Sequence, residues 1–330
     1  MEPDPDRPET ERSSAAVAAH PVTWERRRET LAALDPQFAA TWSEHVSRLF
    51  ERPQLDLRKR LLVLTAQYTM RGDLPALEET LLAAADAGLD PREPLEAILQ
   101  CYVYAGQGRV GAAAEVFLDV ATRRGLLDRV QADQPPLDAA LSGRSLDVER
   151  EAWAGGDRDD PRLGPLLEKY GWHGISTGLR LRPGHHINLV ATLDAVDPGF
   201  LQIWLDTVYR SLYSRRVLDD PTRLLCVVAN CFAVGETHQA RRHMRGALRQ
   251  GAGARELLEV IFQSCAIVGH PHMLPLAVDD LLTIADEEGR LGELVDEDRI
   301  DEVRSIVRRR VERRDSVHDL GAADTTEKDR

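Results

Sequence analysis

The sequence lacks paired cysteines, long apolar runs and an excess of basic residues, and each absence excludes a class of protein. The four cysteines, at positions 101, 226, 231 and 265, have no CxxC spacing, which argues against a disulfide framework. No apolar stretch reaches the ~20 residues of a membrane-spanning helix. The acidic, proline-rich N-terminus lacks the basic start and apolar core of a secretory signal. We therefore expect a cytoplasmic protein that does not insert into a membrane.

The charge balance and the missing motifs narrow the function further. Lys and Arg number 42 against 55 Asp and Glu, a net charge of −13, which disfavours nucleic acid as a partner. The motifs GxGxxG, GxxxxGK[ST], HExxH and GxSxG are absent, which removes the minimal parts of nucleotide-binding proteins, zincins and serine hydrolases. Apolar residues make up 43% of the 330 residues, so a globular core of about two domains is expected.

Apolar residues recur at helical spacing in the central part of the chain. One stripe comprises Leu95, Ile98, Leu99 and Tyr102, and another comprises Leu258, Ile261, Phe262 and Cys265. No segment shows the sustained alternation that is typical of a half-buried strand. The sequence therefore predicts an all-α protein, and the similar stripes prompt a search for an internal repeat.

The chain contains such a repeat. Residues 55–106 align with 218–269 without a gap, with 16 identities in 52 positions, where ordinary composition gives roughly three or four. Upstream, LDPQFAATW at 34–42 matches VDPGFLQIW at 196–204 after a single-residue insertion. Asp-Pro pairs and glycines at matching places predict the same succession of helices in both segments. The sequence thus predicts two homologous helical units in tandem.

The repeat divides the chain into six predicted parts. They are a disordered tail (1–23), a first helical unit (24–128), a partly packed linker (129–185), a second helical unit (186–294), a C-terminal helix (295–314) and a second disordered tail (315–330). We call the two units copy one and copy two.

Three segments of each copy form a pattern that is typical of one family. Copy one carries RLLVLTAQYTMRGDL, LLAAADAG and REPLEAILQCYVYAGQG, and copy two carries RLLCVVANCFAVGE, HMRGALRQG and RELLEVIFQSCAIVGHP. This pattern resembles carboxymuconolactone decarboxylase and the related alkyl hydroperoxidase D proteins. The resemblance implies an all-α fold of two alkyl hydroperoxidase D-like units that assembles into rings and needs no cofactor. We therefore expect a homodimer or homotrimer.

The residues separate the two chemistries that the resemblance implies. The peroxidase branch uses a CxxC whose second cysteine lies four residues before a histidine. The CxxC positions hold Asp73 and Ala76 in copy one, and Glu236 and Gln239 in copy two. A thiol peroxidase is therefore excluded. The decarboxylase branch needs only a general acid and a cation that binds the substrate carboxylate, and His243 matches its histidine, whereas copy one has Thr80.

Our first hypothesis is a cofactor-independent lyase or isomerase that acts on a small cyclic carboxylate or a polyketide-like enol. The candidate catalytic residues are His243 as general acid/base, with Glu236 or Glu259 to orient it. The candidate residues for binding the anionic substrate are Arg223, His238, His270 and His272. Copy two would hold the site, because most of these groups are missing from copy one.

Two of these candidates have a structural alternative. Glu259 and Arg223 recur in copy one as Glu96 and Arg60. Residues demanded by the fold recur in both copies, whereas residues that do chemistry are free to differ. The repetition therefore favours a role in packing for these two residues.

Two alternatives for the whole site also remain open. His238, His243, His270 and His272 could form a zinc or iron site, because neutral imidazoles suit both metals. The resemblance needs no metal, and we predict none. The chain could also be a non-catalytic scaffold or small-molecule binding module that keeps the fold without the chemistry. The concentration of histidines in copy two favours the enzyme.

Overall fold

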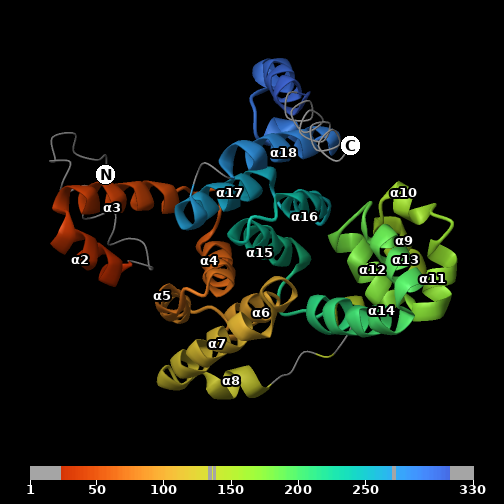
Figure 1. Ribbon diagram of the computed structural model, residues 1–330, viewed down its shortest axis with the longest axis horizontal. Helices are drawn as coiled ribbons and strands as arrows, with labels where there is room; N and C mark the ends of the chain where they lie inside the picture. The colour runs from red at the N-terminus through yellow and green to blue at the C-terminus, as the bar shows by residue number, and fades with distance from the viewer. Residues whose placement is uncertain (1–23, 133–135, 137–138, 270–272, 313–330) are drawn as a thin grey trace, which may run out of the picture.

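The computed structural model describes residues 24–132, 136, 139–269 and 273–312 (Figure 1). Within these residues every regular element is a helix, and no strand is present. The prediction of an all-α protein is therefore confirmed. None of the described helices is both long enough and apolar enough to cross a membrane.

Copy one forms the helices at the left and bottom of Figure 1. They are α2 (Glu25–Leu34), α3 (Pro36–Phe50), α4 (Leu57–Arg71), α5 (Leu74–Asp86), α6 (Arg92–Leu99), α7 (Tyr102–Arg123) and α8 (Leu127–Ala132), which crosses the predicted end of the copy at residue 128. The side chains of Asp35 and Asp56 cap α3 and α4 by accepting hydrogen bonds from backbone N–H groups three residues later. Gly106 interrupts α7 with a φ of 66°, a conformation that glycine adopts without strain.

Copy two forms the helices that follow α12. They are α13 (His186–Val196), α14 (Pro198–Trp204), the π-helix η2 (Leu205–Tyr213), α15 (Asp220–Ala233), α16 (Thr237–Arg249), α17 (Ala254–Val268) and α18 (Leu274–Glu287). The 3₁₀ turns η3 (Leu291–Glu293) and η4 (Glu297–Arg299) follow, and a helix occupies 300–312.

The π-helix lies where the sequence alignment requires one extra residue. The corresponding part of copy one belongs to α3, which is an unbroken α-helix. A π-helix takes up a single inserted residue by widening its turns, and such elements are frequent at functional sites. The extra residue therefore changes the helix locally and leaves the elements on either side in register.

The segment between the copies packs more extensively than a linker would. It contains the 3₁₀ turn η1 (Ala139–Leu141) and the helices α9 (Leu146–Ala152), α10 (Gly155–Arg158), α11 (Leu163–Tyr170) and α12 (Trp172–Leu181). Residues 174–181 of α12 are all buried, and α12 contacts η2 and α16. This segment forms the right-hand group of helices in Figure 1 together with α13 and α14. It therefore carries part of the core.

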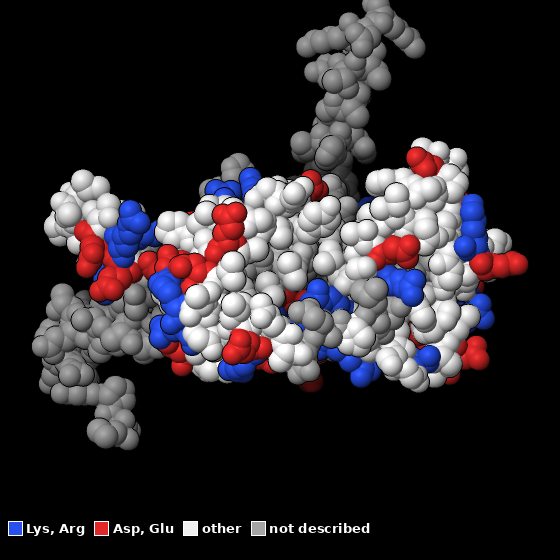
Figure 2. Space-filling view, turned by 90° about the horizontal axis from the view of Figure 1, so that it is seen from below, with Lys and Arg blue, Asp and Glu red and all other residues white. Residues whose placement is uncertain are grey.

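The centre of the molecule is a pair of helices, one from each copy. α4 and α15 pack directly against each other, and α17 contacts both (Figure 1). Leu61, Leu62 and Leu64 of α4 and Leu224 and Leu225 of α15 are fully buried. On the face that Figure 2 shows, basic and acidic side chains are interspersed. The core thus joins the two copies through their equivalent helices.

Candidate functional site

Two buried arginines connect the copies in a reciprocal way. Arg223 of copy two donates from Nη2 to Glu96 Oε1 of copy one at 2.9 Å, and from Nη1 to Gln100 Oε1 at 3.4 Å. Arg60 of copy one donates to Gln263 Oε1 of copy two at 3.2 Å. Arg60 aligns with Arg223, and Gln100 aligns with Gln263. Each arginine therefore binds the glutamine of the opposite copy, so the two contacts are equivalent.

The carboxylates of this network have further partners. Glu259 accepts from Arg52 Nε at 2.8 Å and lies 4.0 Å from Arg60. Glu96 lies 3.2 Å from Arg215 Nε. Both carboxylates are almost fully buried. These contacts favour a structural role for the predicted site residues Glu259 and, through Glu96, Arg223.

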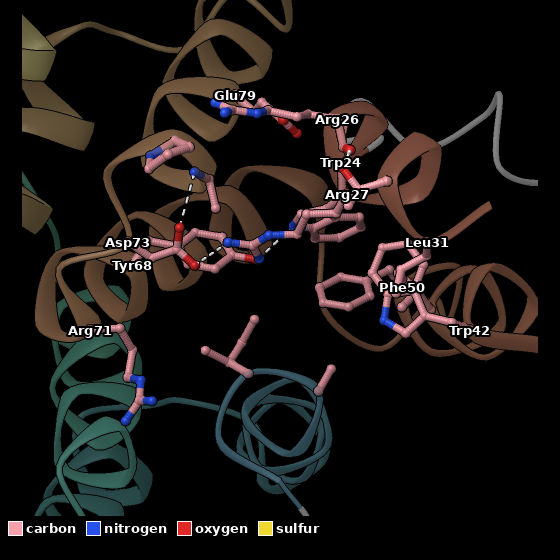
Figure 3. A pocket seen from close by; sticks show the side chains of 16 residues that line it. Trp24, Arg26, Arg27, Leu31, Trp42, Phe50, Tyr68, Arg71, Asp73 and Glu79 are labelled. Carbon is pink, nitrogen blue, oxygen red and sulfur yellow. Dashed lines mark hydrogen bonds and ion pairs between the residues drawn. The ribbon is translucent and has the colours of Figure 1, made fainter. Parts of the chain in front are cut away.

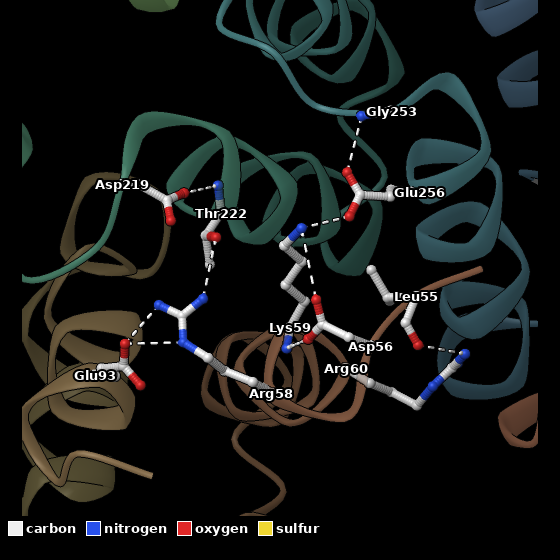
Figure 4. A network of polar contacts seen from close by, with 10 residues as sticks. All are labelled: Leu55, Asp56, Arg58, Lys59, Arg60, Glu93, Asp219, Thr222, Gly253 and Glu256. Atoms are coloured by element: carbon white, nitrogen blue, oxygen red, sulfur yellow. Dashed lines mark hydrogen bonds and ion pairs between the residues drawn. The ribbon is translucent and has the colours of Figure 1, made fainter. Parts of the chain in front are cut away.

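Further polar contacts extend the junction of the copies toward solvent (Figure 4). Lys59 pairs with Glu256 across the junction, and Arg58 pairs with Glu93 while it contacts Thr222 Oγ1 at 3.4 Å. The junction is therefore polar at its edge as well as in its buried centre.

His243 lies in a separate buried cluster. Its Nε2 is 2.8 Å from the hydroxyl oxygen of Tyr104, and only 3% of the residue is exposed. Tyr104 belongs to α7 of copy one, and the two rings meet edge to face with their centroids 6.3 Å apart. Nδ1 of His243 makes no hydrogen bond within the part of the chain that the structure describes. The histidine therefore has one strong polar partner, which copy one supplies.

Arg182, the residue after α12, brings a positive charge to this cluster. It is 8% exposed, and its Nη2 donates to Gln239 Oε1 of α16 at 3.1 Å. Burial would lower the pKa of Arg182, but the nearby hydroxyls of Tyr209 and Tyr104 outweigh that effect and the pKa is raised. Arg182 is therefore a buried cation whose charge acts on His243 and on Tyr209 and Tyr104.

The enclosure sets the protonation states of the cluster. Burial and the charge of Arg182 lower the pKa of His243 to about 3, although the Leu181 carbonyl opposes the shift. Burial raises the pKa of Tyr104 well above its ordinary value and that of Cys231 to about 12. Near neutral pH the cluster therefore contains a neutral imidazole, a protonated phenol and a protonated thiol.

The other predicted residues lie apart from His243 or outside the described residues. Glu236 is the exposed residue that precedes α16, and His238 is exposed in its first turn. Neither makes a hydrogen bond or ion pair with His243 in the described structure. His270 and His272 lie outside the described residues. No group of three or more potential metal ligands occurs among the residues that the structure describes.

Sequence reasoning missed Tyr104 and Arg182. Tyr104 aligns with Ile267, so the comparison of copies that singled out His243 also contained the signal for its partner. Arg182 lies outside the repeat and had no such signal. Its position depends on how α12 packs against η2 and α16.

Comparison with known proteins supports part of the resemblance. Residues 198–278 match the sequence profile of the Carboxymuconolactone decarboxylase family. The matched segment runs from α14 into α18 and includes His243, Arg223 and Glu259. A search of curated proteins found no match to this chain.

Proposed function

We propose that the chain is a cofactor-independent lyase or isomerase that transfers a proton on a small cyclic carboxylate or a polyketide-like enol at His243. The observation that supports this most is the hydrogen bond between His243 and Tyr104 in an enclosed cluster that also holds Arg182. Such chemistry needs a general acid and a cation that binds the substrate carboxylate, and the residues of this cluster are suited to both roles. The match of residues 198–278 to the family gives further support.

Each side chain has a role in this proposal. Arg182 attracts the anionic substrate and stabilises the negative charge that develops on an enolate oxygen. Tyr104 and His243 form the pair that delivers and takes up the proton. In a decarboxylation, the bond between the ring and the carboxylate breaks, its electron pair enters the conjugated ring, and a proton from this pair ends on the ring carbon. Carbon dioxide leaves, and solvent restores the proton.

Substrate binding would raise the pKa of His243. The free protein holds the imidazole neutral because it is buried beside a cation. An anion beside Arg182 would oppose that cation and raise the pKa of His243 toward neutrality. Proton transfer is most efficient when the pKa lies near the working pH. The bound substrate would thus make the site competent.

The tandem arrangement is part of the proposal. Copy two supplies His243 and copy one supplies Tyr104, so the site forms only where the copies meet. We also propose assembly into a homodimer or homotrimer, which light scattering over a concentration series would test. A monomer at every concentration would contradict the assembly.

A binding module without chemistry is the second candidate. The 3% exposure of His243 favours it, because a fully enclosed histidine is also what a packed core contains. Turnover separates the two candidates.

The test uses a panel of unsaturated lactone acids and cyclic β-keto acids, with carbon dioxide release and deuterium uptake from solvent as readouts. His243→Gln and Tyr104→Phe should each lower turnover by about 100- to 10,000-fold, the usual value of general acid/base help. Thr80→Ala and Tyr102→Phe are the matched controls, because Thr80 aligns with His243 and Tyr102 is an exposed neighbour of Tyr104. Binding without turnover by the wild type would support the module. Equal loss in the Thr80→Ala variant would move the site to copy one.

A further inference from the structure

A pocket of about 530 Å³ opens beside copy one (Figure 3). It lies between α2, α3, the α4–α5 turn and the end of α17, so both copies line it. Its walls carry four aromatic residues: Trp24, Trp42, Phe50 and Tyr68. Pockets of this size suit small organic molecules.

The pocket includes one position at which the two copies differ. Ile267, which lines it, aligns with Tyr104. Thr80 aligns with His243, and its hydroxyl turns back to donate to the Ala76 carbonyl at 2.7 Å. Tyr104 and His243 themselves meet at 2.8 Å. Beside copy one Ile267 lines the pocket, whereas Thr80 is buried in α5 and is not among the lining residues.

The aromatic wall is held in place by its own contacts. Trp24 Nε1 donates to the Tyr68 hydroxyl at 2.6 Å, which fixes the indole. Its ring centroid lies 5.1 Å from that of Phe50 and 6.5 Å from that of Trp42. A prearranged aromatic wall favours a flat ring as ligand, because little side-chain freedom is lost on binding.

The polar groups of the pocket carry an excess of positive charge. Arg27 and Asp73 form an ion pair that neutralises both (Figure 3). Arg26 and Arg71 also line the pocket, and neither guanidinium group makes a hydrogen bond or ion pair with the part of the chain that the structure describes. Figure 3 shows the two residues at opposite ends of the pocket, with the Arg71 side chain turned away from the aromatic wall. Glu79 Oε2 is buried without a hydrogen-bond partner there, and burial raises the pKa of this carboxyl. Among the described residues, the pocket thus offers one free cation, Arg26, further positive charge from Arg71 at its rim, and one unused acceptor.

We propose that this pocket binds a hydroxylated aromatic carboxylate. The ring lies against Trp24, Trp42 and Phe50, the carboxylate faces Arg26, and the hydroxyl donates to Glu79. Arg71 adds positive charge at the rim of the pocket. This site is separate from the His243 cluster and does not depend on catalysis there.

Calorimetric titration of the full chain with 3-hydroxy-2-naphthoate, and with uncharged 2-naphthol for comparison, tests the proposal. Ala266 is exposed on α17 and lines the pocket, so Ala266→Trp should fill the space and abolish binding of both probes. Ala195→Trp, an exposed position on α13 outside the pocket, is the matched control and should bind as the wild type does. Unchanged binding by Ala266→Trp, or no binding by the wild type, would overturn the site.

A double variant tests the charge selectivity. Arg26→Ala with Arg71→Ala removes two exposed side chains, so the fold should persist. Binding of 3-hydroxy-2-naphthoate should weaken about five- to tenfold, since exposed ion pairs are each worth a few tenths to 1 kcal/mol. Binding of 2-naphthol should not change. Equal weakening of both probes would refute the role of the arginines.

Discussion

Replacing Glu96 by glutamine tests the buried junction of the copies directly. The carboxylate holds Arg223 at 2.9 Å, and the two side chains are 1% and 0% exposed. Removing one partner of a buried ion pair leaves the other charge uncompensated, which costs roughly 3–5 kcal/mol. Glutamine keeps the shape and one acceptor, so we expect a loss of about 3 kcal/mol.

Glu259→Gln is the matched comparison, because Glu259 is the aligned residue. Its closest cation, Arg52, is 40% exposed and can turn to water, while Arg60 lies 4.0 Å away and keeps its bond to Gln263. The loss should therefore be only about 1–2 kcal/mol. Glu44 is a surface residue that pairs with Arg48 at 3.2 Å. Its replacement by glutamine should lower the stability by less than about 0.5 kcal/mol.

Urea unfolding measures the stability of the three variants, with tryptophan fluorescence and circular dichroism as the two probes. Coincident transitions by both probes show that each variant unfolds in a single cooperative step. A cost for Glu259→Gln equal to or above that for Glu96→Gln would refute the reasoning from burial. Replacing Glu96 and Arg223 together by methionine should recover part of the loss, because no unpaired charge remains.

Two further predictions concern buried histidines and close backbone contacts. Burial lowers the pKa of His186 to about 3, far below the unfolded value, so stability is full above about pH 6.5 and falls as the pH decreases toward 3. Between pH 7.5 and 5, protonation of His186 should account for about 2 kcal/mol of this loss of stability. Urea unfolding of His186→Gln should lack this part of the loss. If the unfolding free energy of the variant fell with pH as steeply as that of the wild type, the lowered pKa of His186 would be contradicted. A Cβ atom at Gly246 would lie 2.4 Å from the Leu181 carbonyl oxygen, so Gly246→Ala should destabilise the fold by about 1–3 kcal/mol. A Cβ atom at Gly111 would meet nothing within 4 Å, so Gly111→Ala should stabilise α7 by about 0.5–1 kcal/mol. Calorimetric melting temperatures that change in the same direction in both variants would contradict this account of the packing.

The helices of the two copies and several of their ends follow from the sequence alone, whereas helices α9 to α12 between the copies did not. Apolar spacing fixes which face of each helix is buried, and the Asp-Pro pairs at Asp35 and Asp197 fix where helices begin, because these are local interactions. The single-residue insertion also indicated where copy two would depart from copy one, although the alignment did not specify a π-helix.

Which helices face one another was decided only in the tertiary structure. Arg60 bonds to a residue 203 positions away, and Tyr104 meets His243 across 139 positions. Helical periodicity identifies a buried face but carries no information about its partner. The reciprocal partners of the arginines, the place of Arg182 and the open pocket of copy one therefore depend on packing between the copies, because each requires side chains from distant segments to meet.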